Sequence, residues 1–252
     1  MIYILLPAYN EERDIGTLLK RIQDAMERQV VSHYRVLIVN DGSTDRTLVV
    51  VANAQEHMPI ELLDHGVNKG LGQAMLTGLS HAAALVQDDD VLVSMDADNT
   101  HDPCLIEAML EKVRAGADVV IASRYETGGE EVGLSAVRSI LSRGASGLLR
   151  VFFPIEGAKD YTCGFRAYRG AVLKRAFQAY GDHLVEERGF TCMAEILIKL
   201  RAVRVNVAEV PLVLRYDLKS GRSKMKVART ILRYFVLISH NLFLRPVVAH
   251  AH

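Results

Sequence analysis

Short apolar runs alternate with amphipathic stretches through the first half of the chain, and this alternation constrains the fold more than any other feature. Five apolar runs are predicted strands: residues 2–6, 35–39, 60–63, 91–95 and 119–122. Four amphipathic stretches are predicted helices: residues 15–26, 44–56, 70–86 and 102–115. Strands that alternate with helices in this way predict an α/β fold with a mostly parallel sheet.

The second half of the chain has a less regular pattern. A stretch rich in glycine and acidic residues, 126–133, is predicted to be a mobile loop. Helices are predicted over 135–152, 171–179 and 191–201, and strands over 162–168 and 205–214. A chain of 252 residues without an internal repeat or a low-complexity linker is expected to form one main domain.

Composition and charge narrow the class of protein. Polar residues interrupt every stretch of about 18 residues, so no simple transmembrane helix is predicted. The three cysteines have no metal-ligand spacing, which suits a reducing compartment. The net charge is zero, and no nucleic-acid partner is expected. After Asp217 the chain has no acidic residue and is basic: Lys219, Arg222, Lys224, Lys226, Arg229, Arg233 and Arg245.

Polar residues follow four of the predicted strands at the points where the strands end. These segments are Pro7-Ala8-Tyr9-Asn10-Glu11, Asn40-Asp41-Gly42-Ser43, Asp96-Ala97-Asp98 and Ser123-Arg124. An open parallel sheet binds its ligand outside the carboxyl ends of its strands. We therefore expect these side chains to gather at one edge of the sheet.

Asp96 and Asp98 directly follow a predicted buried strand. In extended backbone, carboxylates one residue apart point to the same side. Mg²⁺ or Mn²⁺ prefers oxygen ligands and keeps positions open for phosphate oxygens. The pair is therefore a candidate site for a divalent ion that holds a diphosphate. The alternative, that both are simply solvated loop acids, stays open, although the position after a buried strand favours the metal site.

Asp41 lies in the segment Asn40-Asp41-Gly42-Ser43-Thr44-Asp45. Gly42 permits a tight turn, and Ser43 or Thr44 can cap the helix that follows. A turn and a cap explain these residues without a ligand, but they do not explain Asp41. A carboxylate at the end of a strand can accept hydrogen bonds from a base or a ribose, so Asp41 is a candidate nucleotide-binding residue.

The segment Asn68-Lys69-Gly70-Leu71-Gly72 resembles a phosphate loop but lacks the Gly-Lys-Ser/Thr ending of a Walker sequence. A kinase or nucleotide hydrolase is therefore disfavoured. These glycines, together with Gly78 further along the chain, allow a helix either to approach the nucleotide pocket or to pack closely on the sheet.

Arg124 and Arg138 flank the predicted mobile loop. A guanidinium group binds phosphate through paired hydrogen bonds. Surface arginines are commonly just solvated, but these two positions suggest a clamp that closes on the acceptor.

Together these segments resemble the family-2 inverting glycosyltransferases, and within them the polyprenyl-phosphate sugar synthases typified by dolichol-phosphate mannose synthase. The resemblance includes two further segments, Cys163-Gly164-Phe165-Arg166 and Gly221-Arg222-Ser223-Lys224. It implies a GT-A fold, with a Rossmann-like nucleotide-binding sheet and flanking helices, in a catalytic domain over residues 1–224.

The resemblance also implies roles for individual residues. Those expected to bind the nucleotide are Pro7, Tyr9, Glu11, Asp41, Lys69 and Asp96, and those expected to hold Mg²⁺ or Mn²⁺ are Asp96 and Asp98. Those expected to bind the acceptor phosphate and the donor diphosphate are Arg124, Arg138, Ser223 and Lys224. Asp98, Arg124 and Arg138 are the predicted catalytic residues. The sequence departs from the family at Thr100, where Gln is common, and at Leu218, where Arg is common and Lys219 stands beside it.

The implied reaction is inverting transfer of a sugar from GDP-mannose or a UDP-sugar to a polyprenyl phosphate. A phosphate oxygen is already anionic, whereas a saccharide hydroxyl needs a general base, for which Glu195 is the candidate. The chain contains no Trp and no Gln-x-x-Arg-Trp segment of the hydroxyl-directed synthases, which favours the phosphate. Transfer to a saccharide remains the alternative. A catalytically silent nucleotide-sugar binding protein is disfavoured, because it would be expected to lack Asp96 or Asp98.

The C-terminal segment, residues 225–252, is predicted to form an amphipathic helix that ends near Pro246. On a helical wheel that begins at Arg222, the basic side has Arg222, Lys226, Arg229, Arg233 and His240, and the side mostly opposite has Ile231, Leu232, Phe235, Ile238 and Leu242. Such a helix can lie on an anionic membrane surface. The protein is therefore expected to be cytoplasmic and peripheral at the cytoplasmic membrane face. The alternative is a helix that covers the core or forms a homodimer contact.

Overall fold

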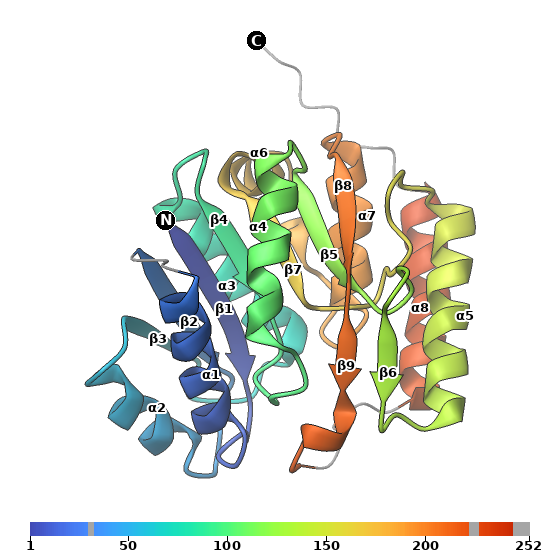
Figure 1. Ribbon diagram of the computed structural model, residues 1–252. Coiled ribbons are helices and arrows are strands. Elements are labelled where there is room, and N and C mark those ends of the chain that lie inside the picture. Colours follow the sequence, from blue (N-terminus) through green and yellow to red (C-terminus); the bar gives the residue numbers. More distant parts are fainter. Residues whose placement is uncertain (30–32, 222–226, 244–252) are drawn as a thin grey trace.

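The computed structural model describes residues 1–29, 33–221 and 227–243. A seven-stranded sheet runs through the described part of the chain in the order β3-β2-β1-β4-β7-β5-β8 (Figure 1). The strands are β1 (Ile2–Ala8), β2 (Tyr34–Asn40), β3 (Ile60–Asp64), β4 (Val91–Ser94), β5 (Val119–Ser123), β7 (Arg166–Arg169) and β8 (Val207–Pro211). Only β7 is antiparallel to its neighbours in this sheet. The predicted α/β fold with a mostly parallel sheet is confirmed.

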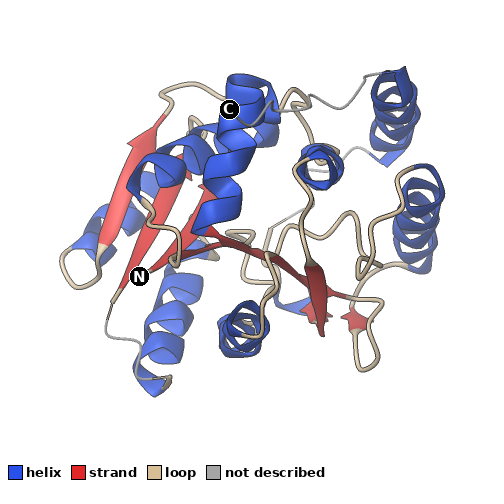
Figure 2. Cartoon of the chain, turned by 90° about the horizontal axis from the view of Figure 1, so that it is seen from above, coloured by secondary structure: helices blue, strands red, loops and turns tan. Residues whose placement is uncertain are grey.

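Helices cover both faces of this sheet (Figure 2). On one face lie α1 (Ile15–Arg28), α2 (Thr47–Gln55) and α4 (Ile106–Arg114), and on the other lie α3 (Leu71–Leu85), α6 (Gly170–Tyr180) and α7 (Cys192–Ala202). The short 3-10 helices η1 (Pro103–Leu105), η2 (Gly181–Leu184) and η3 (Tyr216–Leu218) lie in the connections. Ile4, Leu37, Val93 and Val120 of the central strands have no exposed surface. Burial on both faces explains why these strands are continuous apolar runs.

A second, two-stranded sheet overturns one prediction. Residues 130–132 of the predicted mobile loop form β6 (Glu130–Val132), which pairs with β9 (Val213–Arg215). The predicted strand over 205–214 is divided, because β8 continues the central sheet whereas β9 leaves it to pair with β6. The paired strands β6 and β9 have only three residues each. Pairing with a distant segment, rather than a local pattern, makes them strands.

Helices α5 (Ala136–Phe152) and α8 (Val227–Phe243) lie side by side at the end of the molecule beyond β8 (Figure 1). Tyr234, Leu237 and Ile238 of α8 are buried, so this helix covers the core with one face. The Arg233 side chain of α8 also contacts the rest of the protein, since its guanidinium pairs with the Glu187 carboxylate at 2.5 Å. Among the described helices, none is long and apolar enough to cross a bilayer.

Candidate active site

The carboxyl ends of β1, β2, β4 and β5 meet at one edge of the sheet, the lower edge in Figure 1. The polar segments that follow these strands come together there, as predicted. After β1, Tyr9 and Glu11 are partly buried, and Pro7 lies at the end of the strand itself. The Asn10 N–H donates to Ser43 Oγ at 2.9 Å, which joins the segment after β1 to the segment after β2.

The predicted cap of the second helix is wrong. Helix α2 begins at Thr47, and its first amide donates to Asp45 Oδ1 at 2.9 Å. Ser43 and Thr44 instead contact Asn10, because the Thr44 N–H donates to Asn10 Oδ1 at 2.7 Å. These two residues therefore tie the loops of β1 and β2 together.

Asp96 and Asp98 lie at the end of β4, and each has defined partners. Asp98 is 8 % exposed, and its Oδ1 accepts a hydrogen bond from Thr100 Oγ1 at 2.6 Å. Its Oδ2 accepts a hydrogen bond from the ammonium group of Lys219. The Asp96 N–H donates to His101 Nδ1 at 3.2 Å. A Cβ atom at Gly164 would lie 3.2 Å from Asp96 Oδ1, so glycine leaves this carboxylate its room.

The two aspartates differ in the direction of their pKa shifts. Burial raises the pKa of Asp96; the nearby His101 opposes this rise, and the charge of Asp98 adds to it. Burial also acts to raise the pKa of Asp98, but the charge and hydrogen bond of Lys219, with the Thr100 hydroxyl, lower it overall. The negative charge at this edge therefore depends on a cation that compensates it.

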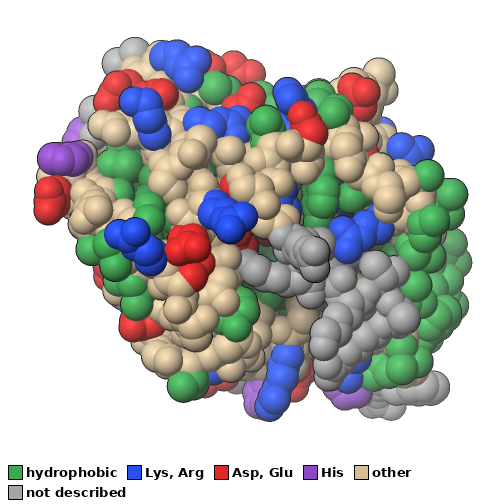
Figure 3. Space-filling view, turned by 90° about the horizontal axis from the view of Figure 1, so that it is seen from below, with side chains coloured by type: hydrophobic (Ala, Val, Ile, Leu, Met, Phe, Trp, Pro, Cys, Tyr) green, Lys and Arg blue, Asp and Glu red, His purple; other side chains and the backbone are tan. Residues whose placement is uncertain are grey.

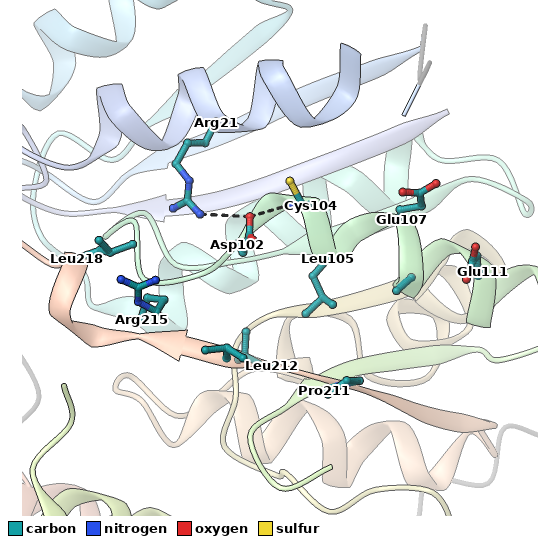
Figure 4. Close-up of a pocket in the computed structure, with 12 residues that line it drawn as sticks. Arg21, Asp102, Cys104, Leu105, Glu107, Glu111, Pro211, Leu212, Arg215 and Leu218 are labelled. Atoms are coloured by element: carbon teal, nitrogen blue, oxygen red, sulfur yellow. Dashed lines mark hydrogen bonds and ion pairs between the residues drawn. The ribbon is translucent and has the colours of Figure 1, made fainter. Parts of the chain in front are cut away.

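Arg21 of α1 braces the loop that contains the aspartates. Its guanidinium donates to Asn99 Oδ1 at 2.6 Å. It also donates to Asp102 Oδ1 at 3.2 Å (Figure 4). Asn99 directly follows Asp98 and has a left-handed φ of 62°, a conformation that asparagine tolerates better than most residues. Local sequence patterns gave no sign of this contact between α1 and the loop.

A cavity of about 510 Å³ lies behind this loop, between α1, α4 and the chain that runs from β8 through β9 (Figure 4). Its lining includes Arg21 and Arg215, and each of these arginines is paired with a carboxylate, Asp102 or Asp217. Asp96 and Asp98 do not line it. The cavity is therefore at the back of the loop and is not the candidate active site.

Asp41 fastens a second loop to the sheet. Its carboxylate accepts hydrogen bonds from the Lys69 amide at 2.8 Å and the Gly70 amide at 2.9 Å, and its Oδ1 lies 2.9 Å from His65 Nδ1. These contacts explain why an aspartate occurs at position 41, which a turn and a helix cap alone did not explain. The Lys69 side chain is exposed at the same edge.

The glycines of this second loop and of α3 serve close packing. A Cβ atom at Gly72 would lie 1.7 Å from Glu187 O, and one at Gly78 would lie 2.2 Å from Leu5 Cδ1 of β1. The alternative of close packing on the sheet is thus confirmed for Gly78. Gly72 lets the start of α3 pack against the segment that precedes α7.

Arg124 is held by a residue that sequence reasoning missed. Its Nε and Nη2 donate to the two carboxylate oxygens of Asp160 at 2.8 and 2.7 Å, and Nη2 also donates to Thr162 Oγ1 at 2.6 Å. Its Nη1 lies 3.4 Å from Glu131 Oε1. Asp160 stands three residues before Cys163 of the Cys-Gly-Phe-Arg segment. That segment was the only sequence signal near Asp160.

Arg138 lies at the start of α5 and donates to the hydroxyl of Tyr216 at 3.1 Å. The Tyr216 ring also lies 5.7 Å from Lys219 Nζ. The structure thus brings Arg138, Lys219 and Asp98 into one cluster. Ser223 and Lys224, predicted to bind phosphate, lie outside the described residues.

Comparison with known proteins identifies the family of this chain and agrees with its fold. Residues 3–177 match the family model described as "Glycosyl transferase family 2". The chain belongs to glycosyl transferase family 2. This glycosyltransferase is 32% identical over 234 residues to a "Dolichol-phosphate mannosyltransferase" of Pyrococcus furiosus, with 92% of this chain and 61% of that protein covered. The chain therefore spans less than two thirds of that relative's length. It is 31% identical over 225 residues to an "Undecaprenyl-phosphate mannosyltransferase" of Micrococcus luteus, with 89% and 87% covered.

Two solved structures share the fold of this family-2 glycosyltransferase. Glucosyl-3-phosphoglycerate synthase from Mycobacterium tuberculosis, in complex with Mn²⁺, UDP and phosphoglyceric acid, superposes with a TM-score of 0.67 at 17% identity, covering 97% of this chain and 79% of that one. Mannosyl-3-phosphoglycerate synthase from Rubrobacter xylanophilus gives a TM-score of 0.61 at 20% identity, covering 96% and 74%. The expected GT-A fold is confirmed.

Replacing Asp160 with Asn in this glycosyltransferase is expected to destabilise the fold by roughly 3 kcal/mol or more at pH 7, because it removes the carboxylate that pairs with the buried Arg124 guanidinium and leaves only the more distant Glu131. Burial acts to raise the pKa of Asp160, but the charge and hydrogen bonds of Arg124, together with the Thr162 N–H, lower it below its ordinary value of 3.8 in the folded state. The stabilisation is complete above that pH and is lost as the pH falls through the folded pKa. Urea unfolding at pH 7, 5, 4 and 3 measures the difference between the two proteins.

The difference is expected to shrink below pH 3.8. Asp88→Asn is the matched control, because the ion pair of Asp88 with Lys174 is exposed and should contribute little. A penalty for Asp160→Asn that is the same at pH 3 and at pH 7 would contradict this assignment.

Proposed function

We propose that this family-2 glycosyltransferase moves a sugar from a nucleoside diphosphate sugar to the phosphate oxygen of a polyprenyl phosphate, with inversion. The observation that carries the proposal is the pair Asp96 and Asp98 at the carboxyl end of β4, where Asp98 already holds a cationic group. The names of the Pyrococcus and Micrococcus relatives support a mannosyl donor and a polyprenyl phosphate acceptor.

The residues at the end of β4 fit Mg²⁺ or Mn²⁺. Both groups offer carboxylate oxygens, the donors that these ions prefer. Asp98 binds the ammonium of Lys219, so its carboxylate lies at a position suited to positive charge. In the described part of the chain no group of three His, Cys, Asp or Glu side chains is arranged to hold a metal ion, so diphosphate and water oxygens would complete the shell. A bound divalent ion would neutralise the leaving diphosphate.

The acceptor side supports a phosphate rather than a hydroxyl. Glu195, the candidate base for a hydroxyl, is 2 % exposed and fully occupied. Its Oε2 accepts the amides of Glu186 and Glu187 at 2.9 and 2.8 Å, and its Oε1 pairs with Lys199 at 2.7 Å. A carboxylate held by three donors is poorly suited to remove a proton. An acceptor phosphate needs no such base.

An anionic group already lies among the residues proposed to bind the acceptor. The carboxylate of Glu131 lies 3.4 Å from Arg124 and 3.9 Å from Arg143, and it accepts a hydrogen bond from Ser139. In this arrangement two guanidinium groups and a hydroxyl surround one oxyanion. An acceptor phosphate that replaced Glu131 would meet the same donors, which supports Arg124 as the residue that positions the nucleophile. Arg138, held by Tyr216, would bind from the other side of the loop.

The helices α5 and α8 support peripheral binding to a membrane. Their outer faces expose apolar side chains: Val137, Ile140 and Val151 of α5, and Leu232, Phe235, Val236 and Leu242 of α8. Hydrophobic side chains gather over this side of the molecule in Figure 3, which looks onto the edge that bears the aspartates. An exposed apolar surface beside the site fits an acceptor whose phosphate lies at a lipid surface. The cytoplasmic membrane face is the proposed location, and a homodimer through the same face is the alternative.

Replacing Asp98 with Asn is expected to lower turnover by roughly 100-fold or more, because it removes a ligand of the ion that neutralises the leaving group. The assay incubates GDP- and UDP-sugars with a short-chain polyprenyl phosphate and Mn²⁺, and measures glycolipid and released nucleotide. Asp89→Asn is the matched control, because Asp89 precedes the same strand and its side chain is fully exposed.

Undiminished transfer by the Asp98 variant in the presence of a chelator would rule out this mechanism. Product formed only with a saccharide acceptor would favour the hydroxyl-directed alternative. Nucleotide binding without transfer to either acceptor would favour a silent binding protein.

Replacing Leu232 and Phe235 together with Ser is expected to reduce binding to anionic vesicles by about tenfold or more, since both exposed side chains would lose their apolar burial in lipid. Vesicle flotation measures the bound fraction. Val49→Ser is the control, because Val49 is an exposed residue of α2 on the far side of the sheet. Absence of the unsubstituted protein from the floated fraction would contradict membrane binding. If the unsubstituted protein sediments as a dimer and the double variant as a monomer, the homodimer would be favoured.

A further inference from the structure

Lys219 is a buried lysine placed over the proposed metal site. Its side chain is 8 % exposed, and its ammonium donates to Asp98 Oδ2. The ring centroid of Tyr216 lies 5.7 Å from the same ammonium. A buried lysine is costly unless a counter-charge holds it. Lys219 and Asp98 therefore compensate each other while no metal ion is bound.

The segment from Tyr216 to Gly221 is tied to three parts of the site. Lys219 binds the loop after β4 through Asp98. The Ser220 N–H donates to Asp14 Oδ1 at 3.2 Å, just before α1. The hydroxyl of Tyr216 accepts a hydrogen bond from Arg138 of α5 at 3.1 Å. One short segment thus contacts both the metal side and the acceptor side of the candidate active site.

Lys219 and a divalent ion would compete for the same carboxylate oxygen, Asp98 Oδ2. Its Oδ1 accepts from the Thr100 hydroxyl at 2.6 Å, and its Oδ2 is taken by Lys219. A divalent ion needs direct contact with a carboxylate oxygen and carries twice the positive charge of an ammonium group. It also repels a lysine placed against it. Metal binding and the Lys219 contact are therefore mutually exclusive at Oδ2.

We propose that Lys219 is a resident counter-cation of Asp98, which a divalent ion must displace, so that metal binding releases the segment from Tyr216 to Gly221. This inference rests on the proposed metal site at Asp96 and Asp98. Release of Lys219 also loosens the segment that holds Arg138 through Tyr216. The occupancy of the metal site is in this way linked to the arginine proposed to bind the acceptor.

Titration with Mn²⁺ alone, followed by electron paramagnetic resonance of the free ion, tests the competition without any turnover. Lys219→Met is expected to bind Mn²⁺ roughly tenfold more tightly than the unsubstituted chain, because no side chain has to be displaced. Lys219→Arg keeps the charge and should stay close to the unsubstituted chain. Lys174→Met is the matched control, because it removes a lysine whose partner, Asp88, precedes β4 at the opposite end of the strand.

A second measurement uses the unsubstituted chain and decides the proposal even where Lys219→Met fails to fold. Labelling with an amine-reactive reagent, read at Lys219 by peptide mass spectrometry, is expected to rise several-fold when Mn²⁺ is added. In Asp98→Asn the labelling should be high with and without the ion.

The failures of the two proposals are distinguishable. If the unsubstituted chain binds Mn²⁺ more tightly than Asp98→Asn, but Lys219→Met gives no gain and Mn²⁺ leaves the labelling unchanged, the displacement is wrong and the metal site stands. If Asp98→Asn binds Mn²⁺ as well as the unsubstituted chain, the metal site is wrong and this inference is wrong with it.

Discussion

Negative charge at the end of one buried strand is the constraint on which the rest of the site depends. Asp96 and Asp98 follow β4 in surroundings where an uncompensated carboxylate is unstable. Two positive charges compensate this negative charge. Lys219, which lies 121 positions from Asp98 in the sequence, donates to Asp98, and the charge of Arg124 acts on Asp96. A place that requires positive charge is also a place that can bind a cation. Structural compensation and the proposed chemistry therefore have the same origin.

One side of this site is formed where the sheet departs from a parallel arrangement. Strand β7 is inserted antiparallel between β4 and β5, and the segment before it passes the loop that bears the aspartates. Gly164 leaves room for the Asp96 carboxylate, and the Phe165 ring stacks on His101 with centroids 5.1 Å apart. From the other side Arg21 of α1 holds Asn99. The Cys-Gly-Phe-Arg segment thus has a physical role, which is to shape the pocket around Asp96.

The sequence predicted the features that local patterns encode. The periodicities of strand and helix repeat within short windows, so the central strands, their crossover helices and the edge with Asp96 and Asp98 could be predicted. Contacts between distant segments leave no such periodic trace. This is why β6 and its partner β9, and the ion pair of Arg124 with Asp160, were missed. The sequence showed Lys219 as one of the basic residues after Asp217 and as the neighbour of Leu218, but its contact with Asp98 required the folded chain.

We propose that Asp96 and Asp98 together bind a divalent ion that takes part in the transfer. Diffraction data at the manganese absorption edge, from crystals soaked with MnCl₂ and GDP or UDP, test it most directly. We expect one anomalous peak about 2.0–2.4 Å from carboxylate oxygens of both aspartates, bridged to the diphosphate. A manganese ion bound elsewhere, with these two side chains turned away from the nucleotide, would contradict the account.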